Sequence, residues 1–159
     1  AIIAADTDSD GTFNGTFFTG IFDGNGHKIT NFTINGGSNS FLGLFGYILS
    51  GGSVKNLGLE NFTVSGDGVY VSGLVGLNNS GSISNCYSTG TVSGSQAVGG
   101  LTGLNYLGSI INCYSNCDVN GTTGNTGGLA GVNNGSINQC YSTGTVSGSS
   151  GSQGIGGLA

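Results

Sequence analysis

Three acidic residues near the N-terminus have the spacing of an oxygen-ligand cation site. In the run DTDSDG, residues 6–11, the carboxylates of Asp6, Asp8 and Asp10 alternate before a glycine bend. This pattern matches the first half of a calcium-binding loop, although Phe17 stands where an EF-hand loop ends in a bidentate glutamate. We expect a capping strand with exposed acids and keep calcium as the alternative. No other metal or cofactor is expected.

The other ionisable residues do not have the spacing of an active site. His27 is the only histidine, so neither a site with several imidazole ligands nor a relay with a second histidine can be assembled. Polysaccharide hydrolysis needs two neighbouring carboxylates, whereas Asp23, Glu60, Asp67 and Asp118 fall in different columns of the stacked repeats. The sequence also has no arginine that could polarise a uronate. The chain is therefore predicted not to be an enzyme.

The second half of the chain contains three close copies of one unit. They are GLVGLNNSGSISNCYSTGTVSG from Gly73, GLTGLNYLGSIINCYSNCDVNG from Gly100 and GLAGVNNGSINQCYSTGTVSG from Gly128, with weaker copies from Gly20 and Gly43. A period this short suits one turn of a solenoid and is too short for a domain. Within each unit apolar and polar residues alternate with one break of phase, which is typical of two strands joined by a bend.

The predicted fold class is all-β: a parallel β-helix, or β-solenoid, of roughly five to six coils of about 23–30 residues each. Residues 1–19 are expected to form an N-terminal edge or cap segment. Residues 20–159 divide into the coils 20–42, 43–72, 73–99, 100–127 and 128–156, followed by a truncated repeat at 157–159.

Stacked coils place equivalent residues in columns with a spacing of about 4.8 Å. Three inward columns are predicted: Phe32, Leu57, Cys86, Cys113 and Cys140; Ile29, Val54, Ile83, Ile110 and Ile137; and Leu44, Leu74, Leu101, Leu129 and Leu158. At the bend, one column of side-chain amides is predicted to form a hydrogen-bonded ladder: Asn31, Asn56, Asn85, Asn112 and Gln139.

Four cysteines in a secreted chain usually indicate disulfides. Because Cys86, Cys113 and Cys140 share an inward column, buried thiols are the preferred interpretation. Cys117 follows Cys113 by four residues on one strand, roughly 13 Å away at full extension, which is too far to bridge directly.

The residue after each column cysteine points outward by alternation. This gives an exposed column of Tyr87, Tyr114 and Tyr141, a candidate surface for sugar rings or another protomer. The alternative is that these aromatic neighbours only stabilise strand pairing.

Charge and hydropathy exclude two classes of partner. Two lysines, no arginine and a net charge of −5 leave no basic patch for nucleic acid or for an anionic membrane surface. The longest apolar runs are a few residues, so membrane insertion is not expected either.

The unit GGL(V/A)G-(L/V)-N…S-I-x-N-C-Y-S-T-G-x-V-S-G resembles the GLUG repeat, a motif of bacterial surface proteins named after its G-L-x-G core. The segment FDGNGHKITNFTI, residues 22–34, resembles the stretch that commonly precedes such repeats, including in surface proteins with an M26-type immunoglobulin-A1 peptidase. The resemblance covers about residues 6–159. It implies a secreted or surface-anchored protein with a β-helical stalk and no activity of the repeat itself, and the peptidase zinc motif H-E-x-x-H is absent.

We therefore expect a non-catalytic structural or adhesive stalk, or a filament-forming module, of an extracellular or cell-surface protein. The alternative is a carbohydrate-binding module that uses the tyrosine column. A polysaccharide-active β-helix enzyme and an ice-binding protein are favoured less. The expected partners are other copies of the chain, joined end to end through open coil edges, and host or matrix glycans.

Overall fold

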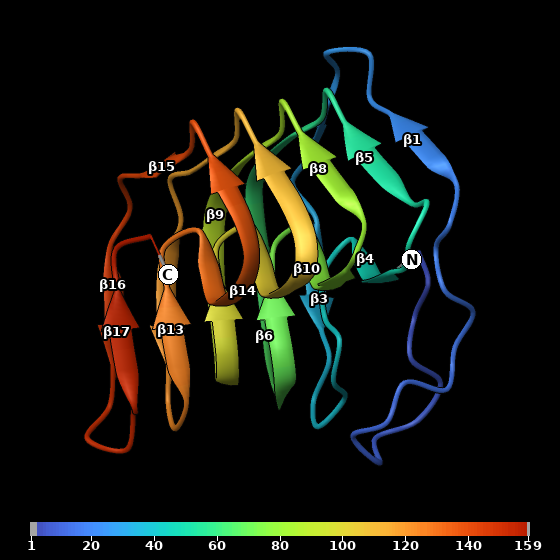
Figure 1. The fold of residues 1–159 in the computed structure, drawn as a ribbon. Helices are drawn as coiled ribbons and strands as arrows, with labels where there is room; N and C mark the ends of the chain where they lie inside the picture. The colour runs from blue at the N-terminus through green and yellow to red at the C-terminus, as the bar shows by residue number, and fades with distance from the viewer. Residues whose placement is uncertain (1–2, 159) are drawn as a thin grey trace.

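The computed structural model describes residues 3–158, and every regular element in that range is a β-strand (Figure 1). The strands wind into a parallel β-solenoid of about five turns, which confirms the predicted fold class. Residues 1, 2 and 159 lie outside the described part, and with them the start of the predicted cap segment and the end of the truncated repeat. No helix in the described range is long and apolar enough to cross a membrane.

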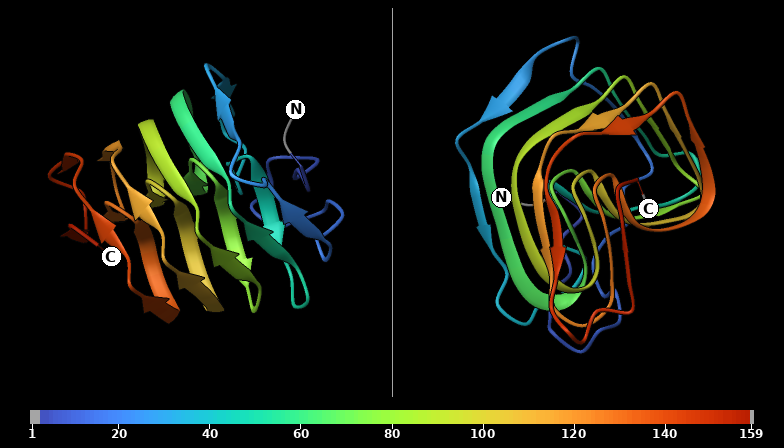
Figure 2. Two further views of the ribbon diagram at one scale, coloured as in Figure 1. Left: turned by 90° about the horizontal axis from the view of Figure 1, so that it is seen from above. Right: turned by 90° about the vertical axis from the view of Figure 1, so that its left-hand side faces the viewer.

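Two parallel sheets form the walls of the solenoid. The first contains β1 (Ile21–Asp23), β4 (Phe45–Ile48), β5 (Ser53–Lys55), β7 (Val75–Asn79), β8 (Ser82–Ser84), β10 (Thr102–Ile111) and β14 (Ala130–Asn138). The second contains β2 (Lys28–Thr30), β3 (Thr33–Asn35), β6 (Gly58–Ser72), β9 (Tyr87–Gly99), β11 (Tyr114–Ser115), β12 (Asp118–Gly121), β13 (Asn125–Gly127), β15 (Tyr141–Ser142), β16 (Val146–Gly148) and β17 (Gly154–Gly156). Neighbouring strands come from successive coils, so each coil stacks on the one before it (Figure 2).

The second glycine of the G-L-x-G core is required at the tight inner corner of each coil. Seen along the axis, the coils superpose and their outline is indented on one side (Figure 2). A Cβ added to Gly103 would lie 2.7 Å from the Cα of Tyr70, and one added to Gly76 would lie 2.9 Å from the Cα of Phe41. Both distances are far shorter than a carbon–carbon contact of about 3.5–4.0 Å, so only glycine lets the two backbones approach this closely.

The register supports the predicted inward columns from the second coil onward. Val54, Ile83 and Ile110 pair in sequence and have no exposed surface, and the half-buried Ile137 follows them. The leucines at the start of each repeat are buried as far as Leu129. These side chains fill the interior between the two sheets.

The predicted register of the first coil is wrong. Phe22, and not Ile29, pairs with Val54, because Ile29 lies opposite Leu59 in the other sheet. In the first coil, the strand that pairs with residues 53–55 is therefore residues 21–23, one strand earlier than predicted.

The same shift removes two residues from their predicted columns. Phe32 stacks on Phe62, with ring centroids 5.2 Å apart, and so does not continue the column of Leu57. Asn31 lies in the stretch that pairs with residues 58–65, where the equivalent bend residue is Asn61 and not Asn56. The physical reason is that this coil bends twice, and both bends carry an asparagine.

The N-terminal segment lies along the edge of β4. Ile3 and Phe18 form isolated parallel bridges with Phe45 and Ile48. The backbone N–H of Ile3 donates to the carbonyl of Leu44, 2.8 Å away. This edge of the first sheet is therefore paired by residues that precede the first coil.

The bend residues from the second coil onward share a left-handed backbone. The φ angle is 54° at Asn56, 51° at Asn85, and 52° at both Asn112 and Gln139. Asparagine adopts this conformation more readily than other residues with a side chain. The last three side chains are exposed to solvent, so backbone conformation accounts for this column better than the predicted hydrogen-bonded amide ladder does.

One substitution pair separates the two explanations. We expect Asn85→Ala to lower the free energy of unfolding by about 1 kcal/mol, because alanine disfavours the left-handed region. Asn85→Gly should cost less, since glycine adopts that region freely. Urea denaturation of both variants measures the difference. An equal loss in the two would instead assign the cost to the side-chain amide.

Candidate functional site

The three predicted surface tyrosines form a continuous stack. Tyr87, Tyr114 and Tyr141 are in register on β9, β11 and β15. Their ring centroids are 5.0 Å and 5.1 Å apart, and the ring planes differ by 3° and 4°. Each ring therefore covers the face of the next, and the stack presents ring edges and hydroxyls to solvent.

The first ring of the stack is fixed by a glycine and a carboxylate. A Cβ added to Gly58 would lie 2.3 Å from Cζ of Tyr87, so this ring lies directly over the glycine. The Tyr87 hydroxyl donates to Oε1 of Glu60 at 2.8 Å, and the Lys28 ammonium donates to Oε2 at 2.8 Å. The hydrogen bonds from Lys28 and Tyr87 lower the pKa of Glu60, and the carboxylate raises the pKa of Tyr87 to about 12.

The raised pKa predicts an alkaline step in stability. The folded state favours the neutral phenol of Tyr87. The hydrogen bond from Tyr87 to Glu60 therefore contributes fully to folding stability below pH 10, and this contribution is lost as the pH rises toward about 12. Burial also raises the pKa of Tyr114, so titration of tyrosinate absorbance should show late-ionising tyrosines, of which the Tyr87 step moves to lower pH in Glu60→Gln. As a control, Asp118→Asn should leave that titration unchanged. A titration that is identical in wild type and in Glu60→Gln would show that Glu60 does not cause the late ionisation of Tyr87.

The predicted calcium loop is held by hydrogen bonds to one asparagine. The Asn14 side-chain amide donates to Asp8 Oδ2 at 2.9 Å and to Asp10 Oδ2 at 3.4 Å. The Asn14 backbone N–H donates to Asp6 Oδ1 at 2.9 Å, and a backbone hydrogen bond from Thr12 lowers the pKa of Asp10. Within residues 3–158, no group of three or more His, Cys, Asp or Glu side chains is arranged to hold a metal ion. Calcium binding by this loop stays a prediction.

The cysteines lie inside the solenoid as thiols. Cys86, Cys113 and Cys117 are buried and Cys140 is partly buried. All four are free thiols. The backbone N–H of Cys86 donates to Sγ of Cys113, and the backbone N–H of Cys113 donates to Sγ of Cys140, both at 3.4 Å. Burial raises the pKa of the Cys117 and Cys140 thiols, which keeps them protonated and unreactive.

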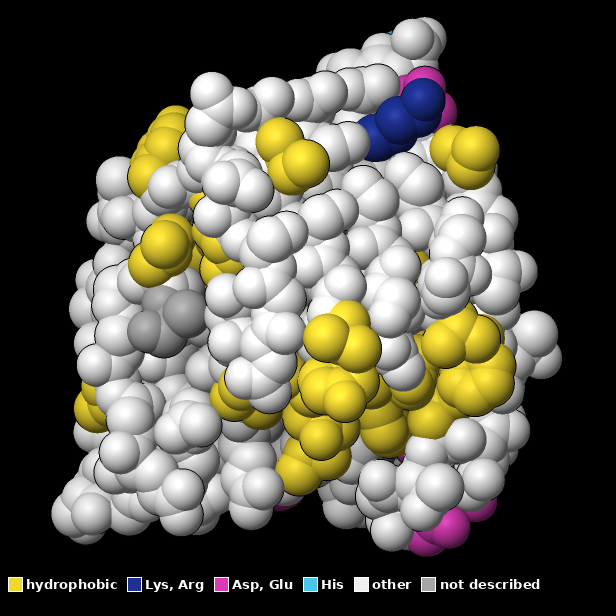
Figure 3. All heavy atoms as spheres, in the orientation of Figure 1, with side chains coloured by type: hydrophobic (Ala, Val, Ile, Leu, Met, Phe, Trp, Pro, Cys, Tyr) yellow, Lys and Arg dark blue, Asp and Glu magenta, His cyan; other side chains and the backbone are white. Residues whose placement is uncertain are grey.

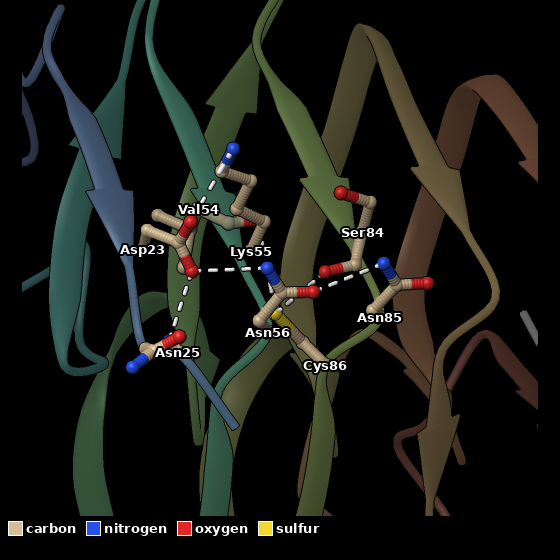
Figure 4. A network of polar contacts seen from close by, with 8 residues as sticks. All are labelled: Asp23, Asn25, Val54, Lys55, Asn56, Ser84, Asn85 and Cys86. Carbon is tan, nitrogen blue, oxygen red and sulfur yellow. Dashed lines mark hydrogen bonds and ion pairs between the residues drawn. The ribbon is translucent and has the colours of Figure 1, made fainter. Parts of the chain in front are cut away.

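The exposed bend amides form a short polar network at one end of the column (Figure 4). Asn85 Nδ2 donates to Asn56 Oδ1 at 3.1 Å, and Asn56 Nδ2 donates to Asp23 Oδ1 at 2.9 Å. Lys55 lies 3.4 Å from the other oxygen of Asp23. The Asn56 bond lowers the pKa of Asp23.

A second asparagine ladder lies in the core and was not predicted from the sequence. Asn78 Nδ2 donates to Asn105 Oδ1 and Asn105 Nδ2 donates to Asn133 Oδ1, both at 2.8 Å. Asn78 and Asn105 have no exposed surface. Their amides also donate to the carbonyls of Gly81 and Gly108, which bridges the turn after β7 and the irregular stretch of β10 between Tyr106 and Ser109. The signal in the sequence is the first asparagine after the G-L-x-G-(L/V) core of each repeat.

The fold defines a β-solenoid repeat protein whose parallel coils stack on one another. The family model of the GLUG motif matches residues 67–93 and 94–122, so the central coils are similar to GLUG repeats.

A solved structure supports the architecture independently. The crystal structure of a "putative immunoglobulin A1 protease from Bacteroides ovatus" is 19% identical with a TM-score of 0.52, over 86% of this chain and 68% of that chain. At this identity the likeness shows the fold alone. The search of curated proteins finds no match.

Proposed function

We propose that the chain is a non-catalytic structural module, a stiff stalk of a secreted or cell-surface protein. The observation that carries this proposal is the uninterrupted pairing of successive coils in both sheets, with one continuous core. Each coil contacts only its neighbours, so length and stiffness grow with repeat number. The match to the GLUG motif supports the secreted or surface location, because the resemblance to GLUG repeats implies a surface protein.

Lengthening the chain tests the stalk function. Three extra copies of residues 100–127, inserted after residue 127, should extend the particle by about 14 Å, because each coil adds about 4.8 Å. Small-angle scattering measures the length, and thermal melting should stay cooperative. A compact particle, or an extension that unfolds separately, would contradict the proposal. As a matched control, the same copies with Gly103→Val in each should fail to stack.

The carbohydrate-binding alternative is weakened by the geometry of the tyrosine stack. Sugar rings bind to aromatic faces, and here the faces cover one another. The most exposed ring of the stack is Tyr141, at 54%. A glycan array probed with wild type and with Tyr141→Ala tests this alternative directly. Retention that the substitution abolishes would favour a glycan-binding module.

The two less favoured alternatives have their own tests. Incubation of the chain with polysaccharides and with immunoglobulin A1 is expected to yield no cleavage products. An ice-binding face would use the column of Thr63, Thr91 and Thr145, but the charged Asp118 lies between the last two. We therefore expect no thermal hysteresis.

End-to-end self-association and adhesion to a host or matrix stay predictions, and sedimentation over a range of concentrations tests the self-association.

A further inference from the structure

An apolar crease runs along the solenoid axis at the inner corner of the coils. One wall is a column of residues with positive φ: Phe41, Tyr70 and Ala97. The other wall is a column on the outer side of the first sheet: Tyr47, Leu77, Leu104 and Val132. Successive coils thus repeat the same pair of apolar positions.

The N-terminal end of the crease is occupied by the chain's own residues. Phe13 packs against Phe41 and Tyr47, with ring centroids 5.3 Å and 4.9 Å apart. Phe17 packs against Tyr47 at 4.8 Å, and the two phenylalanine rings are stacked 5.1 Å from each other. This strap, residues 13–17, crosses the crease with two aromatic side chains.

Further along the axis the crease is open. A hollow of about 240 Å³ lies there. Its apolar walls are Val69, Tyr70, Ala97 and Val132, and uncharged polar side chains line the rest: Gln96, Thr123, Asn125 and Gln153. No lining residue of this hollow carries a charge. Tyr70, Leu104 and Val132 remain partly exposed. Hydrophobic side chains gather in a band across the lower half of this face of the molecule (Figure 3).

We propose that the open part of the crease binds an extended, uncharged peptide segment that carries aromatic side chains. The strap shows which chemistry the walls accept, because its rings pack on the register equivalents of Tyr70 and Leu77. The open stretch continues the surface that the strap covers. This binding function is separate from the stalk function and does not depend on it.

The probe is a labelled synthetic peptide with the strap sequence DGTFNGTFFTG, residues 10–20. Fluorescence anisotropy measures its binding to the full chain. We expect saturable binding that weakens at least about tenfold in Val132→Asp, because a carboxylate would be desolvated in the hollow. Thr91→Asp on the outer face is the matched control and should bind as wild type does. A probe with Phe13 and Phe17 replaced by alanine should not bind.

Two further measurements keep the test decisive. Thermal melting verifies that Val132→Asp folds, and Tyr70→Ala replaces it if it does not. The proposal would be overturned if the peptide did not bind at millimolar concentration. It would also be overturned if wild type and the crease variant bound the peptide equally, since equal binding would indicate that the peptide exchanges with the native strap. A dimer of the protein alone that the crease variant abolishes would assign the crease to a second copy and would also overturn it.

Discussion

Replacing Ile110 with aspartate is expected to unfold the central coils, with a loss of more than about 4 kcal/mol in the free energy of unfolding. Ile110 has no exposed surface and pairs with Ile83 on one side and Ile137 on the other. A carboxylate in this column would be buried without a partner, and the interior offers no cation to neutralise it. Chemical denaturation and circular dichroism measure the loss.

The neighbouring residue supplies the matched control. Ile111 lies on the same strand, points to the opposite face and pairs with Ser84 and Asn138. Ile111→Asp should therefore shift the melting temperature only slightly, by the amount typical of a surface substitution. Similar losses in the two variants would mean that the side-chain alternation assigned to β10 is incorrect.

The fold class could be predicted because every repeat carries the same local pattern. Alternation of apolar and polar residues, a bend asparagine and a G-L-x-G core recur at nearly constant spacing, and only stacked coils satisfy all three at once. The column through Val54, Ile83 and Ile110 follows from this spacing alone. Constant spacing also placed Tyr87, Tyr114 and Tyr141 in one outward row.

The first coil could not be placed by spacing, since it is irregular. It bends at both Asn25 and Asn31, and the pattern of apolar residues fits either bend. The decisive signal is the tripeptide Asn-Phe-Thr, which occurs at residues 31–33 and again at 61–63. Aligning these two copies gives the observed stacking of Phe32 on Phe62.

Two features of the surface could not be predicted from the sequence: which aromatic ring faces are free, and the apolar crease. Sequence spacing gives the outward direction of Tyr114, but whether its ring faces are free depends on side-chain rotamers. The apolar crease was also missed. Its two walls come from different parts of each coil, and only the close backbone contacts of the corner glycines show that the walls lie side by side. Both features depend on how coils pack laterally, which a repeat period does not encode.

The buried asparagine ladder should contribute more to stability than the exposed bend column. Asn105 accepts a hydrogen bond from Asn78 and donates one to Asn133, and it has no exposed surface. Asn105→Ala removes both bonds and leaves the Asn78 amide without one of its acceptors inside the core. We expect a loss of about 2–3 kcal/mol in the free energy of unfolding, measured by urea denaturation.

Two companion variants separate hydrogen bonding from packing. Asn138→Ala, at an exposed position of β14, should change stability by less than about 0.5 kcal/mol. Asn105→Leu fills the volume without restoring the hydrogen bonds, and the equivalent position of an earlier coil is the buried Ile48. Leucine should therefore recover the cavity part of the loss and retain the part that is due to the unpaired amide of Asn78. A leucine variant as stable as wild type would show that the ladder specifies the turn geometry without stabilising the fold.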